Sequence, residues 1–130
     1  MKFLATLLLL FSACAIWAQA RPLSPVGEWE GESVCQVPKP CTTEHVIYEI
    51  KQSAQGQMTI KADKVVTGQR QWMGDIRCQW SASEQNLTCP MEGRTPGIWE
   101  FKIGRNEMTG TLVIREGNVL FRKIAVKRKS

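Results

Sequence analysis

The feature that most constrains this chain is a period-two alternation of apolar and polar side chains, which runs from residue 26 almost to the C-terminus. Successive side chains of a β-strand point to opposite faces, so this alternation is typical of strands with one buried face. Turn-forming sequences such as Thr67-Gly68 separate the alternating segments, and no stretch has sustained helical periodicity. The pattern predicts an all-β protein with eight strands, at residues 26–35, 45–51, 57–65, 71–81, 87–91, 98–104, 107–115 and 119–128.

Eight short antiparallel strands that each have one apolar face must bury those faces together. Closing the sheet on itself does so and also removes the exposed sheet edges. We therefore expect an eight-stranded antiparallel up-and-down barrel, with a two-sheet β-sandwich as the alternative that would show the same alternation. The 130 residues suffice for one domain, which we place at residues 21–130.

Residues 1–20 have the composition of a secretory signal peptide. Lys2 precedes an almost uninterrupted apolar run over residues 3–17, and residues 18–20 form a small-x-small cleavage site. The run is shorter than a typical transmembrane span. We expect the rest of the chain to be secreted or periplasmic and not transmembrane. Cys14 lies in a sequence that loosely resembles a bacterial lipobox, so a lipid-anchored form is the alternative.

Four of the five cysteines lie beyond the predicted signal peptide. An even number of cysteines in an exported chain favours disulfides. Cys35 and Cys41 flank a short proline-containing loop, and Cys78 and Cys89 would lie opposite each other in a hairpin that turns midway between them. Neither spacing is the C-x2-C of a zinc site. We therefore predict the disulfides Cys35–Cys41 and Cys78–Cys89 and no metal site.

The sequence Gly27-Glu28-Trp29 at the start of the first strand resembles the opening of lipocalin- and avidin-type barrels, the calycin group. In those folds the Trp closes one end of the barrel, and an Arg from the end of the last strand packs over it. The resemblance implies that Gly27 and Trp29 mark a closed end here and that Arg128 is the matching arginine. Arg128 could instead belong to a solvated basic tail. The chain also resembles small exported bacterial proteins, and it is shorter than a usual lipocalin.

All four tryptophans beyond residue 20 fall on the apolar phase of their strands. These side chains either line a site for a small apolar or flat ligand or simply fill the barrel. Arg122 lies in the same phase, at the end opposite Trp29, where a charge needs a partner or water. It could bind a carboxylate or phosphate of a ligand, or pair with an internal carboxylate. The candidate ligand-binding residues are Tyr48, Trp72, Trp80, Trp99 and Arg122.

Residues suited to catalysis are scarce. The one histidine, His45, falls on the outward phase and has no second His or Cys at metal spacing. No phosphate-binding loop or nucleophile elbow is present, so we expect no enzymatic activity and no cofactor. The first two strands carry an acidic set on the outward phase, which a solvated face explains: Glu28, Glu30, Glu32, Glu44 and Glu49.

The outward phase also carries apolar residues on neighbouring strands of the expected barrel: Val34, Ile47, Ile98, Val113 and Phe121. They either form one patch for a partner or a second copy, or are ordinary scattered surface residues. The formal net charge of +5 is a mild basic excess, and we expect no nucleic-acid partner in this compartment.

The sequence as a whole predicts an exported lipocalin-like binding module for a small apolar or amphipathic ligand. The alternative is a packed barrel that acts through its outer surface, as an inhibitor or interaction partner of an envelope or extracellular protein. A third hypothesis is a hydrolase that uses the glutamates.

Overall fold

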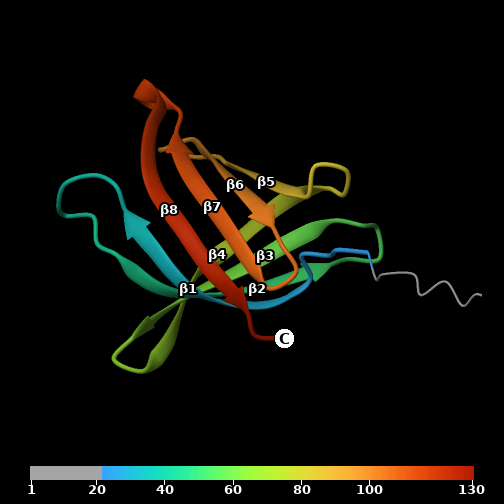
Figure 1. Ribbon diagram of the computed structural model, residues 1–130. Coiled ribbons are helices and arrows are strands. Elements are labelled where there is room, and N and C mark those ends of the chain that lie inside the picture. Colours follow the sequence, from blue (N-terminus) through green and yellow to red (C-terminus); the bar gives the residue numbers. More distant parts are fainter. Residues whose placement is uncertain (1–21) are drawn as a thin grey trace, which may run out of the picture.

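The computed structural model describes residues 22–130, which form a closed antiparallel barrel in strand order β1 to β8 (Figure 1). Each strand is hydrogen-bonded to its neighbours in sequence, and β8 closes the barrel against β1. The up-and-down barrel is confirmed and the β-sandwich is wrong. The strands are β1 (Gly27–Cys35), β2 (Glu44–Gln52), β3 (Met58–Val66), β4 (Gln69–Ser81), β5 (Asn86–Met91), β6 (Gly97–Ile103), β7 (Glu107–Ile114) and β8 (Val119–Arg128), with a 3-10 turn η1 (Glu116–Asn118) before β8.

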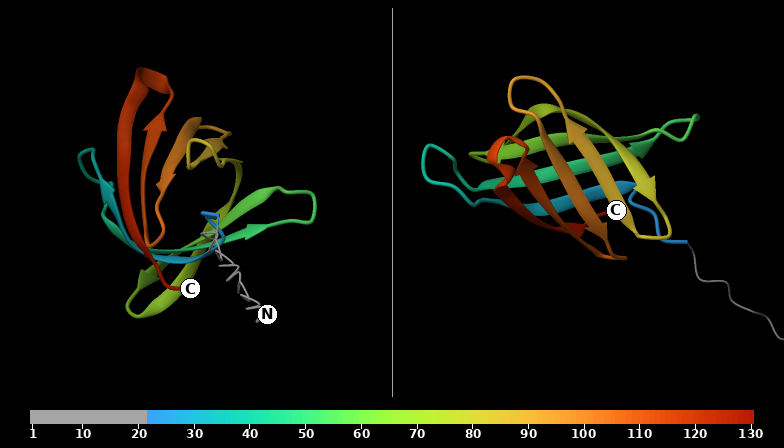
Figure 2. Two further views of the ribbon diagram at one scale, coloured as in Figure 1. Left: turned by 45° about the vertical axis from the view of Figure 1, so that its right-hand side comes forward. Right: turned by 90° about the horizontal axis from the view of Figure 1, so that it is seen from above.

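The two ends of the barrel differ. The described chain enters at the start of β1 and leaves at the end of β8, and these points lie side by side at what we call the closed end. The β1–β2 loop and the β7–β8 connection lie at the opposite, open end (Figure 2). The predicted signal peptide and Cys14 lie outside the described residues. No helix within residues 22–130 has the length and apolar character of a membrane span.

The closed end is sealed by Trp29, whose side chain is fully buried. Its indole N–H donates to the Pro25 carbonyl at 2.9 Å, and the Arg128 guanidinium lies 4.2 Å from the centre of its ring. Arg128 also donates to the carbonyls of Ser24, Val26 and Arg105 at 2.7–2.8 Å. This is the arrangement that the resemblance implies, and a cation over an indole face adds attraction to the apolar burial.

Gly27 makes this closure sterically possible. Its φ of +139° is a conformation that side-chain-bearing residues rarely adopt, and a Cβ there would lie 2.9 Å from Arg128 Nη1. The glycine therefore allows the end of β8 to lie directly against the start of β1.

Both disulfides join the predicted pairs. Cys78 and Cys89 are directly opposite each other across β4 and β5, with Cα atoms 4.2 Å apart. Cys35 and Cys41 close the loop after β1, with Cα atoms 6.0 Å apart.

A β-bulge between β3 and β4 overturns the prediction for Trp72. Ala62 pairs with Gly74 but Asp63 pairs with Trp72, so Met73 is the extra residue. One extra residue reverses the side-chain phase beyond it. The expected inward position of Trp72 is therefore wrong: its side chain is 65% exposed, and its indole N–H donates to Asp75 at 3.0 Å.

A second bulge, between β7 and β8, acts in the same way on Leu120. Leu112 pairs with Arg122 and Val113 pairs with Leu120, which leaves Phe121 as the extra residue. Leu120 shares the even-numbered phase of Arg122 and Ile124, which predicts an inward position, and it is instead 36% exposed. Beyond the bulge, the phase of Arg122 and Ile124 is the expected one.

Some side chains on the outward phase of β2 and β3 are buried. Ile47 and Asp63 both lie on it, yet they are only 5% and 4% exposed. Arg70, from the far side of the bulge, donates through Nε to Asp63 at 2.9 Å and approaches Glu28 of β1 to 3.8 Å. The β3–β4 hairpin therefore bends over this part of the outer face, and Ile47 is not available to the predicted apolar patch.

Candidate functional site

The open half of the barrel interior is hollow. A cavity of about 610 Å³ is lined by residues from seven of the eight strands. This volume lies within the range of about 300–1,000 Å³ that is usual for small-molecule sites. The side chains that form its walls come mainly from the inward phase: Ser33, Glu44, Val46, Tyr48, Ile60, Ala62, Met73, Ile76, Trp99, Phe101 and Arg122.

The cavity also has a lateral slot, because β4 and β5 separate beyond the Cys78–Cys89 disulfide. Their backbone pairing runs from Ser81↔Asn86 to Gln79↔Thr88 and goes no further in the described chain. Residues on both sides of the separation line the cavity. Besides the inward-phase Met91, they include four that are not on the inward phase: Asp75, Arg77, Pro90 and Glu92. We call this opening the β4–β5 slot.

One wall of the cavity is polar and centres on Arg122. Its Nη1 donates to the Thr42 carbonyl at 3.0 Å and to the carbonyl and hydroxyl of Ser33 at 3.2 and 3.3 Å. Its Nη2 donates to Glu44 Oε1 at 3.2 Å, and the two side chains are only 12% and 22% exposed. Burial raises the pKa of the nearby Tyr48 hydroxyl above its ordinary value.

Apart from this wall and the β4–β5 slot, the cavity wall is apolar and aromatic. Trp99 and Phe101 of β6 stack almost in parallel, with ring centres 6.0 Å apart, and Tyr48 meets Phe101 edge-on at the same distance. Gly110 of β7 leaves room for this arrangement, because a Cβ there would collide with the Phe101 ring. Such rings offer a large rigid surface to an apolar ligand.

The cavity therefore brings together Tyr48, Trp99 and Arg122 of the five candidate ligand-binding residues. Trp80 is half-buried and packs against the core instead, and Trp72 lies outside the barrel. Glu44 also lines the cavity, whereas its expected place is in the outward acidic set. Glu44 lies two residues before Val46 and four before Tyr48, so continuing the period-two count would have placed it on the inward phase.

His45 lies on the outer face of the barrel, as expected, and joins a small charged cluster. Its Nδ1 is 2.9 Å from Glu32 and its Nε2 is 3.1 Å from Glu30. The hydrogen bonds to Glu32 and Glu30 raise the pKa of His45, and those from His45 and Lys129 lower the pKa of Glu30. Within residues 22–130 no His, Cys, Asp and Glu side chains group as metal ligands.

The His45 cluster predicts a small pH dependence of stability. Because its folded-state pKa is raised above the usual 6.5, protonated His45 stabilises the fold fully below that value, and this contribution is lost as pH rises through the folded-state pKa. His45→Gln should therefore lower stability at about pH 6, by less than about 1 kcal/mol for so exposed a pair, and have no such effect at about pH 9. Urea unfolding of the wild type and of His45→Gln at the two pH values measures the difference in stability. The same difference at both pH values would contradict the stabilising role of protonated His45.

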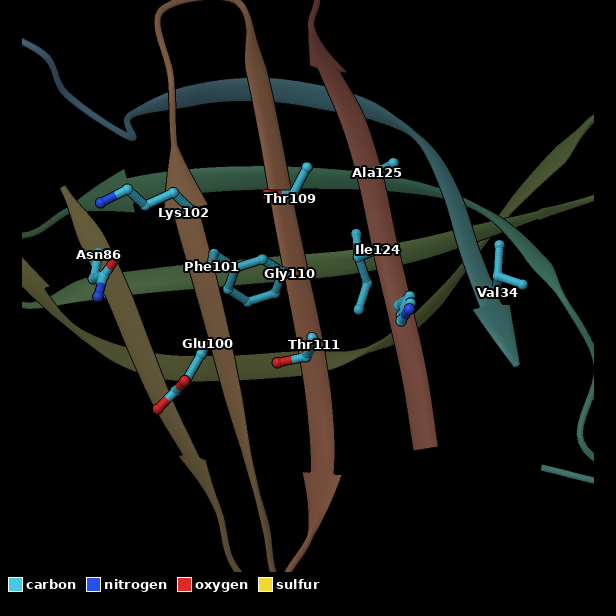
Figure 3. A pocket seen from close by; sticks show the side chains of 11 residues that line it. Val34, Asn86, Glu100, Phe101, Lys102, Thr109, Gly110, Thr111, Ile124 and Ala125 are labelled. Carbon is cyan, nitrogen blue, oxygen red and sulfur yellow. The ribbon is translucent and has the colours of Figure 1, made fainter. Parts of the chain in front are cut away.

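A second hollow, of about 520 Å³, lies on the outer face of β5 to β8 (Figure 3). Lys102, Thr109 and Ala125 form one row across the strands, with Glu100 and Thr111 in a parallel row. The row between them contains Gly110 and the inward-facing Phe101, so no side chain fills the space. We call it the outer groove.

No protein-family model matches this chain, and a search of curated proteins gave no significant match.

Proposed function

We propose that this protein is an exported, lipocalin-like binding module that holds one small apolar or amphipathic ligand in the open half of its barrel, without catalysis. The observation that carries the proposal is the cavity of about 610 Å³, which has aromatic and aliphatic walls, a polar wall at Arg122 and charged side chains at the β4–β5 slot. The two disulfides favour an oxidising compartment, outside the cell or in the periplasm.

The side chains of the proposed site hold one another in place. Ser33, Thr42 and Glu44 already fix the Arg122 guanidinium, and the aromatic rings of β6 stack on each other. A preorganised site loses little conformational freedom on binding, which favours affinity. The hollow interior also speaks against the alternative of a packed barrel that works only through its outer surface.

Filling the cavity tests the proposal. The purified protein is expected to bind the apolar fluorescent probe N-phenyl-1-naphthylamine with one saturable site. Ala62 is buried on the cavity wall, so Ala62→Phe should weaken probe binding by about tenfold or more, equivalent to about 1.4 kcal/mol. Fluorescence titration measures the affinity.

The matched control is Ala125→Phe, which puts the same side chain into the outer groove and should leave probe affinity unchanged. If Ala62→Phe does not fold, Met73→Trp at the half-exposed edge of the cavity replaces it. The proposal is wrong if the wild type shows no saturable binding, or if cavity-filling variants bind the probe as well as it does.

A further inference from the structure

The cavity's buried cation is already neutralised. Glu44 lies 3.2 Å from Arg122 Nη2, and both side chains are largely removed from water. A ligand carboxylate at Arg122 would place a second anion beside Glu44, and two buried carboxylates would then share one guanidinium. Like charges at such separations disfavour each other strongly away from water.

Arg122 nevertheless has hydrogen-bonding capacity left. A guanidinium has five N–H donors. Three Nη1 contacts and one Nη2 contact are made, while Nε–H and the second Nη2 hydrogen have no acceptor among residues 22–130. These two N–H groups therefore remain able to donate to an oxygen of a ligand.

The other charged side chains around the cavity also disfavour an anionic ligand. Asp75, Glu92 and Arg77 lie at the β4–β5 slot. Together with Glu44 and Arg122 they give three carboxylates against two guanidinium groups, so the lining as a whole does not attract an anion. A ligand ammonium group on the polar wall would lie close to the guanidinium of Arg122, and the two positive charges would repel each other.

We propose that the ligand presents an uncharged hydrogen-bond acceptor, a carbonyl of the amide, ester or ketone class, to the unused N–H donors of Arg122. Its apolar body lies against Trp99 and Phe101, and Glu44 excludes anionic amphiphiles of the same chain length. This inference rests on the proposed function, because it concerns the ligand of the same cavity.

A chain-matched series tests this inference by displacement of N-phenyl-1-naphthylamine from the wild-type protein at neutral pH. Decanamide and methyl decanoate should displace the probe at concentrations about tenfold lower than decanoate or decylammonium. Decanoate or decylammonium binding as tightly as decanamide would overturn the inference. The inference would also be wrong if the probe binds but no member of the series displaces it. In that case the saturable binding of the probe would still support the proposed function.

Glu44→Gln separates charge from shape, since the amide oxygen can still accept from Arg122. This variant should bind decanoate about tenfold more tightly than the wild type does and decanamide within about twofold. Glu100→Gln, the same change on the outer face, is the control and should leave both affinities unchanged. If folded Glu44→Gln has the same ratio of decanoate affinity to decanamide affinity as the wild type, the role of Glu44 is contradicted. If that variant does not fold, the order of the four affinities in the wild type still tests the inference.

Discussion

Trp29→Ala is expected to lower the free energy of unfolding by about 4 kcal/mol, the usual order for removing a fully buried large aromatic side chain. Trp29 has no exposed surface, its N–H donates to the Pro25 carbonyl, and Arg128 packs over its ring. The substitution leaves a void at the closed end and removes the surface on which Arg128 rests. Urea unfolding monitored by circular dichroism measures the loss.

Trp72→Ala is the matched control, because it makes the same chemical change at a side chain that is 65% exposed. Substitutions at such surface positions usually change stability by less than about 0.5 kcal/mol. Similar losses in the two variants would contradict the assignment of Trp29 to the closed end and of Trp72 to the outside.

Replacing both Cys78 and Cys89 with alanine should cost about 3–4 kcal/mol, since the chain loses a cross-link and two buried sulfur atoms. Both cysteines are at most 2% exposed, and the bond joins β4 to β5 at the point where their pairing ends. The urea midpoint of the double variant, compared with that of the oxidised wild type, measures the effect.

The double replacement of Cys35 and Cys41 is the comparison for this prediction. That disulfide closes a shorter loop, over a separation of 6 residues against 11, and its sulfurs are only partly buried. Its loss should cost about 2 kcal/mol. A larger loss for the Cys35–Cys41 pair than for the Cys78–Cys89 pair would contradict the view that the latter stabilises the core.

Alternation along single strands was enough to predict the barrel, because each strand's inward phase can be counted in isolation. The same count placed Tyr48, Trp99 and Arg122 on the inward phase. It could not place Trp72 or Leu120, because a bulge belongs to the pairing of two strands rather than to the sequence of one.

The burial of Ile47 depends on a further level of structure. It follows from the bending of the β3–β4 hairpin, which no local pattern encodes. The cavity could not be predicted from the sequence either, since its volume depends on how far β4 and β5 separate and on how much space the inward side chains leave. Glu44 is different, because the period-two count back from Tyr48 and Val46 places it on the inward phase.

The two ends of the described chain meet at the closed end, where the Lys129 amide donates to the Glu28 carbonyl at 2.7 Å. A tether attached to either end is therefore far from the cavity and from the β4–β5 slot. Molecules immobilised on a sensor surface through the C-terminus would present their open ends to the solution. The same proximity makes this barrel suited to circular permutation, with new ends opened in a loop and the old ones joined by a short linker.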